Sequence, residues 1–353
     1  MNIPWPDPRR TRPFLLAIGL GTVGGTLFHL MHLPLAWMLG AIVANTVASM
    51  AGLSLQIPRT LRDPMVAILG VLLGSGFSME LVLSAIDWLP TIAILPLYVL
   101  IVGGVGFLYL RKVTRLDTRT AYFAAMPGGF GEMIIMGEQA GGDIRRIALM
   151  HSTRILLIVM TVPFIARHML VDGTMPVAAA TGTAFEWQLS EIAVLLGCAV
   201  LGYTIGQRIK LPGGTIVGPM ILSAIAHIAG LAHTAPPFFM IAVAQLVIGS
   251  GIGARFSGFT LREVARTLRS GLGLVLAMFG ATLAVGALAH YLTGAPPLAL
   301  FLALSPGGVA EMSLVALALG IEPAYVATHH IIRICLVVMM AGPAFRWLDD
   351  GRE

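Results

Sequence analysis

The stretch Pro-Gly-Gly-Phe-Gly-Glu-Met at residues 127–133 recurs as Pro-Gly-Gly-Val-Ala-Glu-Met at residues 306–312, 179 positions later. Aligned at that offset without a gap, residues 127–160 and 306–339 are identical at 13 of 34 positions. Self-similarity of this kind at a fixed offset indicates an internal duplication. The chain is therefore predicted to consist of two related halves, each with an irregular, glycine-rich segment.

The composition places both halves in a membrane. Of the 353 residues, 57% are apolar and 11% are charged, and the mean hydropathy is +0.88. A soluble domain carries about 25% charged residues, so a soluble globular protein is excluded. Because about 20 apolar residues cross a bilayer as a helix, the chain allows about ten spans. Its 41 glycines and 21 prolines exceed what straight spans need.

We predict a first membrane repeat at residues 1–172, a connecting loop at 173–186 and a second repeat at 187–353. Each repeat is expected to hold five transmembrane helices and one Pro-Gly-Gly segment. The expected spans lie near residues 14–31, 33–51, 62–79, 88–110 and 147–169 in the first half, and near 189–207, 212–231, 238–255, 270–292 and 324–345 in the second. The glycine pairs at 70 and 74, and at 249 and 253, are typical of close helix packing.

The loop charges predict that the repeats are inverted. Basic residues precede the first span and follow the second and fourth in the first half, but follow the first and third in the second half. Basic loops are cytoplasmic, and inversion requires an odd number of crossings. The Pro-Gly-Gly segment should therefore enter and leave on one side, as a re-entrant hairpin with arms of about 15 Å. The chain is expected in the cytoplasmic (inner) membrane, multi-pass, with both termini cytoplasmic.

Both Pro-Gly-Gly motifs, with the His-x-x-Arg that follows each, resemble the duplicated AbrB membrane protein family, whose members are labelled ammonia monooxygenase or regulator. The resemblance covers nearly the whole chain. The glycine segments are also distantly similar to those of the sodium-citrate and sodium-glutamate symporters. The second segment departs from the Gly-Gly-x-Gly pattern at Ala310. These resemblances imply inverted repeats with broken helices meeting at the middle of the membrane.

The repeated motif suggests a binding site. Exposed backbone N–H groups at a helix start attract anions, and the candidate positions are Gly128, Gly129, Gly307 and Gly308. Glu132 and Glu311 fall on the first turn of the following helices. Each either caps its own helix or carries a coupling proton or cation, since intramembrane carboxylates are costly.

A second repeated pattern follows each glutamate. His151 and Arg154 share a helix face, as do His330 and Arg333. One alternative is that each arginine neutralises the glutamate of its own half. Otherwise the arginines bind a substrate carboxylate or phosphate and the histidines take part in ion coupling by relaying protons.

The function expected from these features is secondary transport of a small anionic solute coupled to protons or sodium. The alternative is a membrane-embedded regulator or sensor of gene expression that acts through a cytoplasmic partner. No cofactor or metal-ligand pattern is present in the sequence, so an enzyme, including a monooxygenase, is not expected. Expected partners are the solute, the coupling H⁺ or Na⁺, membrane lipid and a second copy in a homodimer, but not nucleic acid.

Overall fold

The structure is a computed structural model that describes residues 8–169 and 189–350, and within them every regular element is a helix. The first half comprises α1 (Pro8–Leu30), α2 (Ala36–Met50), α3 (Arg59–Ser75), α4 (Met79–Ser84), the 3₁₀ turn η1 (Ala85–Trp88), α5 (Leu89–Ala93), α6 (Leu95–Lys112), α7 (Thr118–Ala125), α8 (Phe130–Gln139) and α9 (Ile144–Met169). The second half comprises α10 (Leu189–Arg208), α11 (Gly214–Ile228), α12 (Phe238–Ala254), α13 (Leu261–Thr293), α14 (Pro297–Leu304), α15 (Val309–Ala318) and α16 (Pro323–Asp350).

Six helical stretches are long and apolar enough to cross a membrane, by length and composition. They are Thr11–Leu30, Met79–Lys112, Ile144–Ala166, Leu189–Arg208, Leu261–Thr293 and Pro323–Leu348. Shorter apolar helices accompany them, among them α2, α11, α12 and α15. The described residues are thus all-helical in their regular structure, and the chain is a polytopic membrane protein. The predicted connecting loop, 173–186, lies outside the described residues.

The expected spans are less uniform than the sequence suggested. The stretch 88–110 is interrupted at Ile94, where α5 gives way to α6. Pro96 stands at the start of α6, where its missing N–H removes no helical hydrogen bond. The helix α2 has 15 residues and so reaches only about 22 Å, short of a hydrocarbon core of about 30 Å.

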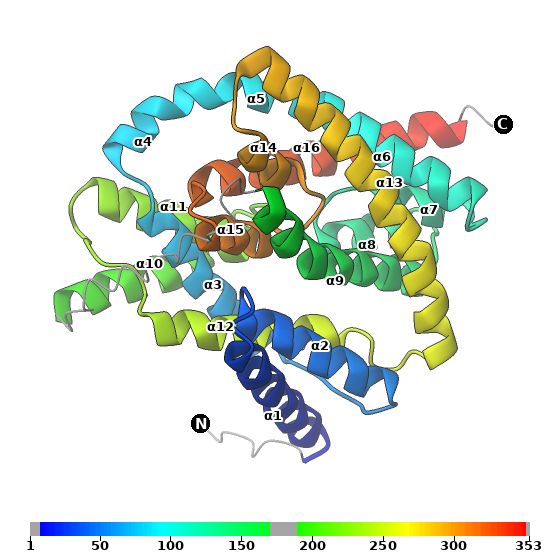
Figure 1. Ribbon diagram of the computed structural model, residues 1–353, viewed down its shortest axis with the longest axis horizontal. Coiled ribbons are helices and arrows are strands. Elements are labelled where there is room, and N and C mark those ends of the chain that lie inside the picture. Colours follow the sequence, from blue (N-terminus) through cyan, green and yellow to red (C-terminus); the bar gives the residue numbers. More distant parts are fainter. Residues whose placement is uncertain (1–7, 170–188, 351–353) are drawn as a thin grey trace.

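Helices of the two halves cross at glycines. A Cβ on Gly70 of α3 would lie 2.4 Å from the backbone oxygen of Ile216 in α11, and one on Gly249 of α12 would lie 2.5 Å from that of Met38 in α2. Only glycine allows backbones to approach so closely, and the packing expected of these glycines is confirmed. Figure 1 shows α1 at the rim of the molecule and α9, α14 and α15 near its centre.

The helix bounds in the two halves keep the spacing of the sequence motif. Adding 179 to the bounds of α7 gives those of α14, and adding 179 to the bounds of α8 gives those of α15. The same sum relates α3 to α12. Corresponding segments of the chain therefore fold into helices of equal length.

Candidate functional site

The first Pro-Gly-Gly segment breaks a helix in two. α7 begins after Asp117, whose side chain accepts a hydrogen bond from Thr120 N, and ends after eight residues. The chain is then extended at Met126 and at Gly129, the N-cap of α8. Eight and ten residues of helix reach about 12 and 15 Å. Pro127 ends the first helix because proline cannot continue the hydrogen-bond ladder without distortion.

The two outer ends of this helix pair lie together. The backbone N–H of Asp143, just after α8, donates to Thr120 Oγ1 at the start of α7, at 2.8 Å. Thr114 and Leu116, which precede α7, line the same cavity as Asp143. The end of α8 therefore lies beside the start of α7.

The two glycines of each Pro-Gly-Gly motif, residues 128–129 and 307–308, are called a glycine tip. Each glycine tip contacts the last long helix of the other half. A Cβ on Gly128 would lie 2.8 Å from Val337 Cγ1 in α16, and one on Gly307 would lie 3.1 Å from Ile158 Cγ2 in α9. Ile158 and Val337 are themselves 179 residues apart. The two tips therefore make equivalent contacts across the molecule.

Arg154 braces the C-terminal end of α7. Its Nη1 donates to the carbonyls of Met126 (3.0 Å) and Ala125 (3.3 Å), and its Nη2 donates to His151 Nδ1 (3.0 Å). His151 Nε2 lies 2.8 Å from the carbonyl of Phe123. A carbonyl only accepts, so Nε2 carries the proton and Nδ1 is the acceptor of a neutral ring. A cation here also matches the negative end of the helix dipole.

Arg333 holds the C-terminal end of α14 in the same way, through backbone carbonyls. Its Nη1 donates to the carbonyl of Ser305 (2.6 Å), and its Nη2 donates to the carbonyl of Gly307 (2.9 Å) and to His330 Nδ1 (3.1 Å). His330 Nε2 lies 3.0 Å from the carbonyl of Leu302. Both arginines and both histidines are buried, with exposed fractions of 3% or less.

The two buried arginines have no carboxylate partner within the described parts of the chain. The ion pairs there lie elsewhere and include Arg145 with Glu263, Arg146 with Asp143 and His233 with Glu191. The pairing of each arginine with the glutamate of its own half is therefore absent. Nε of both Arg154 and Arg333 is buried without a hydrogen-bond partner.

Tyr98 of α6 contacts the end of α14 that Arg333 also holds, and it was not predicted from the sequence. It is fully buried, and its hydroxyl donates to the carbonyl of Leu304 at the end of α14. Its hydroxyl oxygen also lies 3.3 Å from Thr282 Oγ1 of α13. No sequence signal marks Tyr98, because it stands in an apolar helix outside the repeated motif.

Glu132 and Glu311 fold back over the tips. Each is the third residue of its helix and is half-buried. The carboxyl carbon of Glu132 lies 2.8 Å from where a Cβ of Gly129 would be, and that of Glu311 is equally close to the corresponding point on Gly308. A side chain at either N-cap would overlap the carboxylate, so this arrangement favours glycine there.

Arg255 is a second residue that the motif did not reveal. It follows α12, and its guanidinium carbon lies 4.2 Å from the centre of the Phe130 ring, on the first residue of α8. Its Nη1 is buried without a partner, and its charge interacts with those of Arg62 and Glu311. The corresponding residue of the first half is Gly76. Arg255 thus packs against the first residue of the helix that follows the first Pro-Gly-Gly segment.

In the described parts of the chain, no three His, Cys, Asp or Glu side chains are grouped to hold a metal ion. The cysteines, Cys198 in α10 and Cys335 in α16, are both free thiols. The candidate site therefore consists of arginine, glutamate, histidine and backbone N–H groups.

Residues 37–349 match the model of the family described as "Transition state regulatory protein AbrB". "Putative regulator AbrB" of Escherichia coli (strain K12) is 29% identical over 325 residues, covering 90% of each chain. "Uncharacterized protein YhjN" of Bacillus subtilis (strain 168) is 27% identical over 359 residues, covering 94% of this chain and 92% of that protein. The similarity thus extends over both glycine tips.

Proposed function

This chain belongs to the AbrB family of membrane proteins, and we propose that it is a secondary transporter of a small organic anion, coupled to protons or sodium. The charge distribution at the two glycine tips is the main support. Broken helices that meet inside a membrane are the usual architecture of such transporters.

The proposal includes an inverted arrangement of the two halves. On this reading, the pairs α7–α8 and α14–α15 are re-entrant hairpins that enter from opposite faces and meet at their tips. The hydrogen bond between Asp143 N and Thr120 Oγ1 supports a return to the same side for the first pair. The contacts of Gly128 with Val337 and of Gly307 with Ile158 support a meeting of the two tips.

The single observation that carries the proposal is the uncompensated charge of Arg154 and Arg333. Both guanidinium groups are buried, and neither makes an ion pair with a described carboxylate. The carbonyls at the ends of α7 and α14 offset part of this charge. A buried cation without a counter-charge is otherwise costly, and an anionic solute would supply that charge.

Glu132 and Glu311 are the proposed coupling groups. Each stands at the positive end of a helix beside its tip glycine, so a bound anion and the ionised glutamate compete for the same N–H groups. Protonation, or capture of Na⁺, would lower the negative charge and favour anion binding. His151 and His330 use both ring nitrogens in hydrogen bonds, so we assign them to positioning the arginines.

The test is transport by the purified chain in liposomes. Uptake of a panel of radiolabelled di- and tricarboxylates and of short-chain monocarboxylates is measured with an imposed proton gradient, an imposed sodium gradient, or neither. We expect one class of anion to accumulate only with one of the gradients. Glu132→Gln and Glu311→Gln should abolish the dependence on that gradient.

Glu138→Gln is the matched control, because Glu138 lies on α8 as Glu132 does but is exposed and away from the tip. It should transport as the unmodified chain does. Failure to move any anion, with no binding detected by calorimetry, would overturn the proposal.

The printed names of the family and of the Escherichia coli relative favour a second candidate, a membrane-embedded regulator. Such a protein would act through a cytoplasmic partner, because the described loops between helices are short. Capture of one stoichiometric soluble partner from cell extract, with no anion flux in liposomes, would support this candidate over the transporter.

A further inference from the structure

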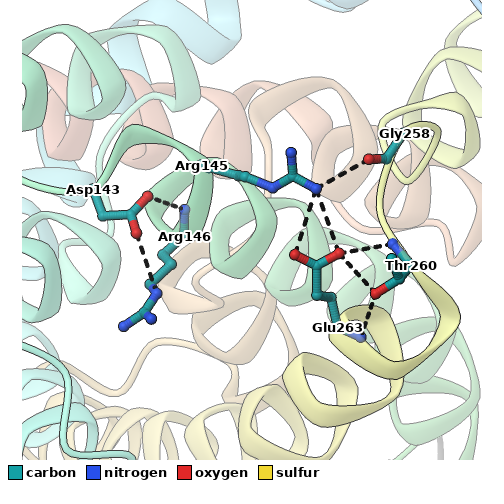
Figure 2. A network of polar contacts seen from close by, with 6 residues as sticks. All are labelled: Asp143, Arg145, Arg146, Gly258, Thr260 and Glu263. Atoms are coloured by element: carbon teal, nitrogen blue, oxygen red, sulfur yellow. Dashed lines mark hydrogen bonds and ion pairs between the residues drawn. The ribbon is translucent and has the colours of Figure 1, made fainter.

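A cavity of about 530 Å³ opens between the starts of α9 and α13, apart from the glycine tips. Its size is that of a site for a small molecule. Figure 2 shows the polar network beside it: Arg145 reaches from α9 to Glu263 and to the carbonyl of Gly258, whereas Arg146 turns back to Asp143.

The two carboxylates at this cavity are occupied by local contacts. Glu263 accepts from the N–H and the hydroxyl of Thr260, both at 2.8 Å, and forms the capping box of α13. Asp143 accepts from the N–H of Arg146 (3.1 Å) and pairs with its Nε (3.2 Å). Each carboxylate thus stabilises a helix start and is already paired with a neighbouring cation.

Most guanidinium N–H groups of the three arginines that line the cavity have no hydrogen-bond acceptor among the described residues. A guanidinium has five N–H groups. Among the contacts of the described residues, Arg145 hydrogen-bonds through Nη2 and Arg146 pairs through Nε, while Arg266 makes no hydrogen bond or ion pair. Hydroxyl groups of Thr267 and Ser270 line the same wall. Arginine forks beside hydroxyl groups match the oxygens of a phosphate group.

We propose that this cavity is a second, separate site, which binds a phosphate-bearing anion. The phosphate belongs either to the headgroup of an anionic phospholipid or to a soluble metabolite. The basic loops predict that this face is cytoplasmic, where both are available. Exposed apolar side chains stand next in sequence to lining residues, namely Val113 and Ile144, so a lipid headgroup here would have its chains beside an apolar surface. The proposal does not depend on transport.

The experiment measures binding to the purified full chain. Native mass spectrometry follows retention of phosphatidylglycerol against zwitterionic phosphatidylcholine, and thermal shift assays follow inorganic phosphate and ATP. The test variant is the pair Arg146→Gln with Arg266→Gln. The matched control is the pair Arg262→Gln with Arg269→Gln, which removes the same charge from exposed positions that do not line the cavity.

We expect the test pair to lose at least fivefold in affinity and the control pair to keep the affinity of the unmodified chain. Binding of phosphatidylglycerol alone would identify a lipid, and binding of phosphate or ATP alone would identify a soluble ligand. Absence of binding by every probe, or equal loss in both pairs, would overturn the proposal. Arg266→Gln alone provides a milder variant if the pair lowers the melting temperature without ligand.

Discussion

Arg154 and Arg333 are two buried cations that make equivalent contacts, although they are 179 residues apart in the chain. Each braces the end of one broken helix through backbone carbonyls, and each holds a histidine through its Nδ1 atom. The pair therefore has two roles to separate: it stabilises the helix breaks, and it provides positive charge at the tips.

Replacing either arginine by lysine should destabilise the protein, because an ammonium lacks the planar fork that reaches carbonyls and histidine together. We expect Arg154→Lys and Arg333→Lys each to lower the free energy of unfolding by about 2–4 kcal/mol. Thermal unfolding in detergent measures this, with the exposed Arg269→Lys as control. Unchanged melting temperatures in both variants would show that the braces contribute little.

Gly129→Ala should displace the carboxylate of Glu132, since a methyl group would overlap it. Gly131→Ala is the matched control on the same helix, because a Cβ there has no neighbour within 4 Å. Alanine is the better helix former by up to about 1 kcal/mol, so the control should be neutral or slightly stabilising. Melting temperatures and gradient-driven uptake are measured for both. Equal behaviour of the two variants would contradict the fold-back of Glu132 over its N-cap.

Arg255→Gln should weaken anion binding by about tenfold or more, the loss expected for a charge-assisted hydrogen bond. Stability should change little, because the interactions described for Arg255 are the stacking on Phe130 and long-range charge effects. Arg262→Gln, an exposed position on α13, is the control. A titration calorimetry result in which both variants bind alike would exclude Arg255 from the site.

Asp117 gives a prediction for acid pH. Burial raises the pKa of this carboxyl, but hydrogen bonds from Thr120 outweigh the burial and hold the pKa below its ordinary value. A depressed pKa means that Asp117 stabilises α7 above its unfolded pKa, near 4, and that this stabilisation is lost as pH falls through the folded value. Asp117→Asn keeps the cap but not the charge. Its unfolding free energy, measured from pH 6 to pH 3, should fall less steeply than that of the unmodified chain.

The membrane sidedness can be checked by cysteine labelling in a chain lacking Cys198 and Cys335. Arg115→Cys and Asp143→Cys should react with an impermeant maleimide from the same side. Asp87→Cys, in the exposed η1 turn, should react from the other. Labelling of Arg115→Cys and Asp143→Cys from opposite sides would rule out a re-entrant first hairpin.

Much of the fold is predictable because apolar runs and the positions of glycine and proline determine where individual helices form, end and pack closely. The Pro-Gly-Gly motifs mark where α7 and α14 end, and the glycines at 70 and 249 mark the close helix crossings. The fold prediction was least accurate where proline divides a continuous apolar stretch, as at Ile94 between α5 and α6.

The partners of the site residues were not predictable, since they depend on which helices meet. The sequence offered Glu132 as a partner for Arg154, yet the arginine binds the carbonyls of Ala125 and Met126. Every residue carries a backbone carbonyl, so the residue types do not indicate which carbonyl an arginine will bind. Arg255 was likewise hidden, because a lone arginine after an apolar helix has the appearance of an ordinary loop charge.

A brace that holds the main chain places little demand on the side chains at the positions it holds. His151 and His330 bond to carbonyls of Phe123 and Leu302, which differ in shape and volume, and the arginines bond to Met126 and Ser305, which differ in polarity. Mutations can accumulate at these positions while the bond persists. The side chains at the two helix breaks can thus differ while the four side chains of the two His-x-x-Arg motifs keep equivalent contacts.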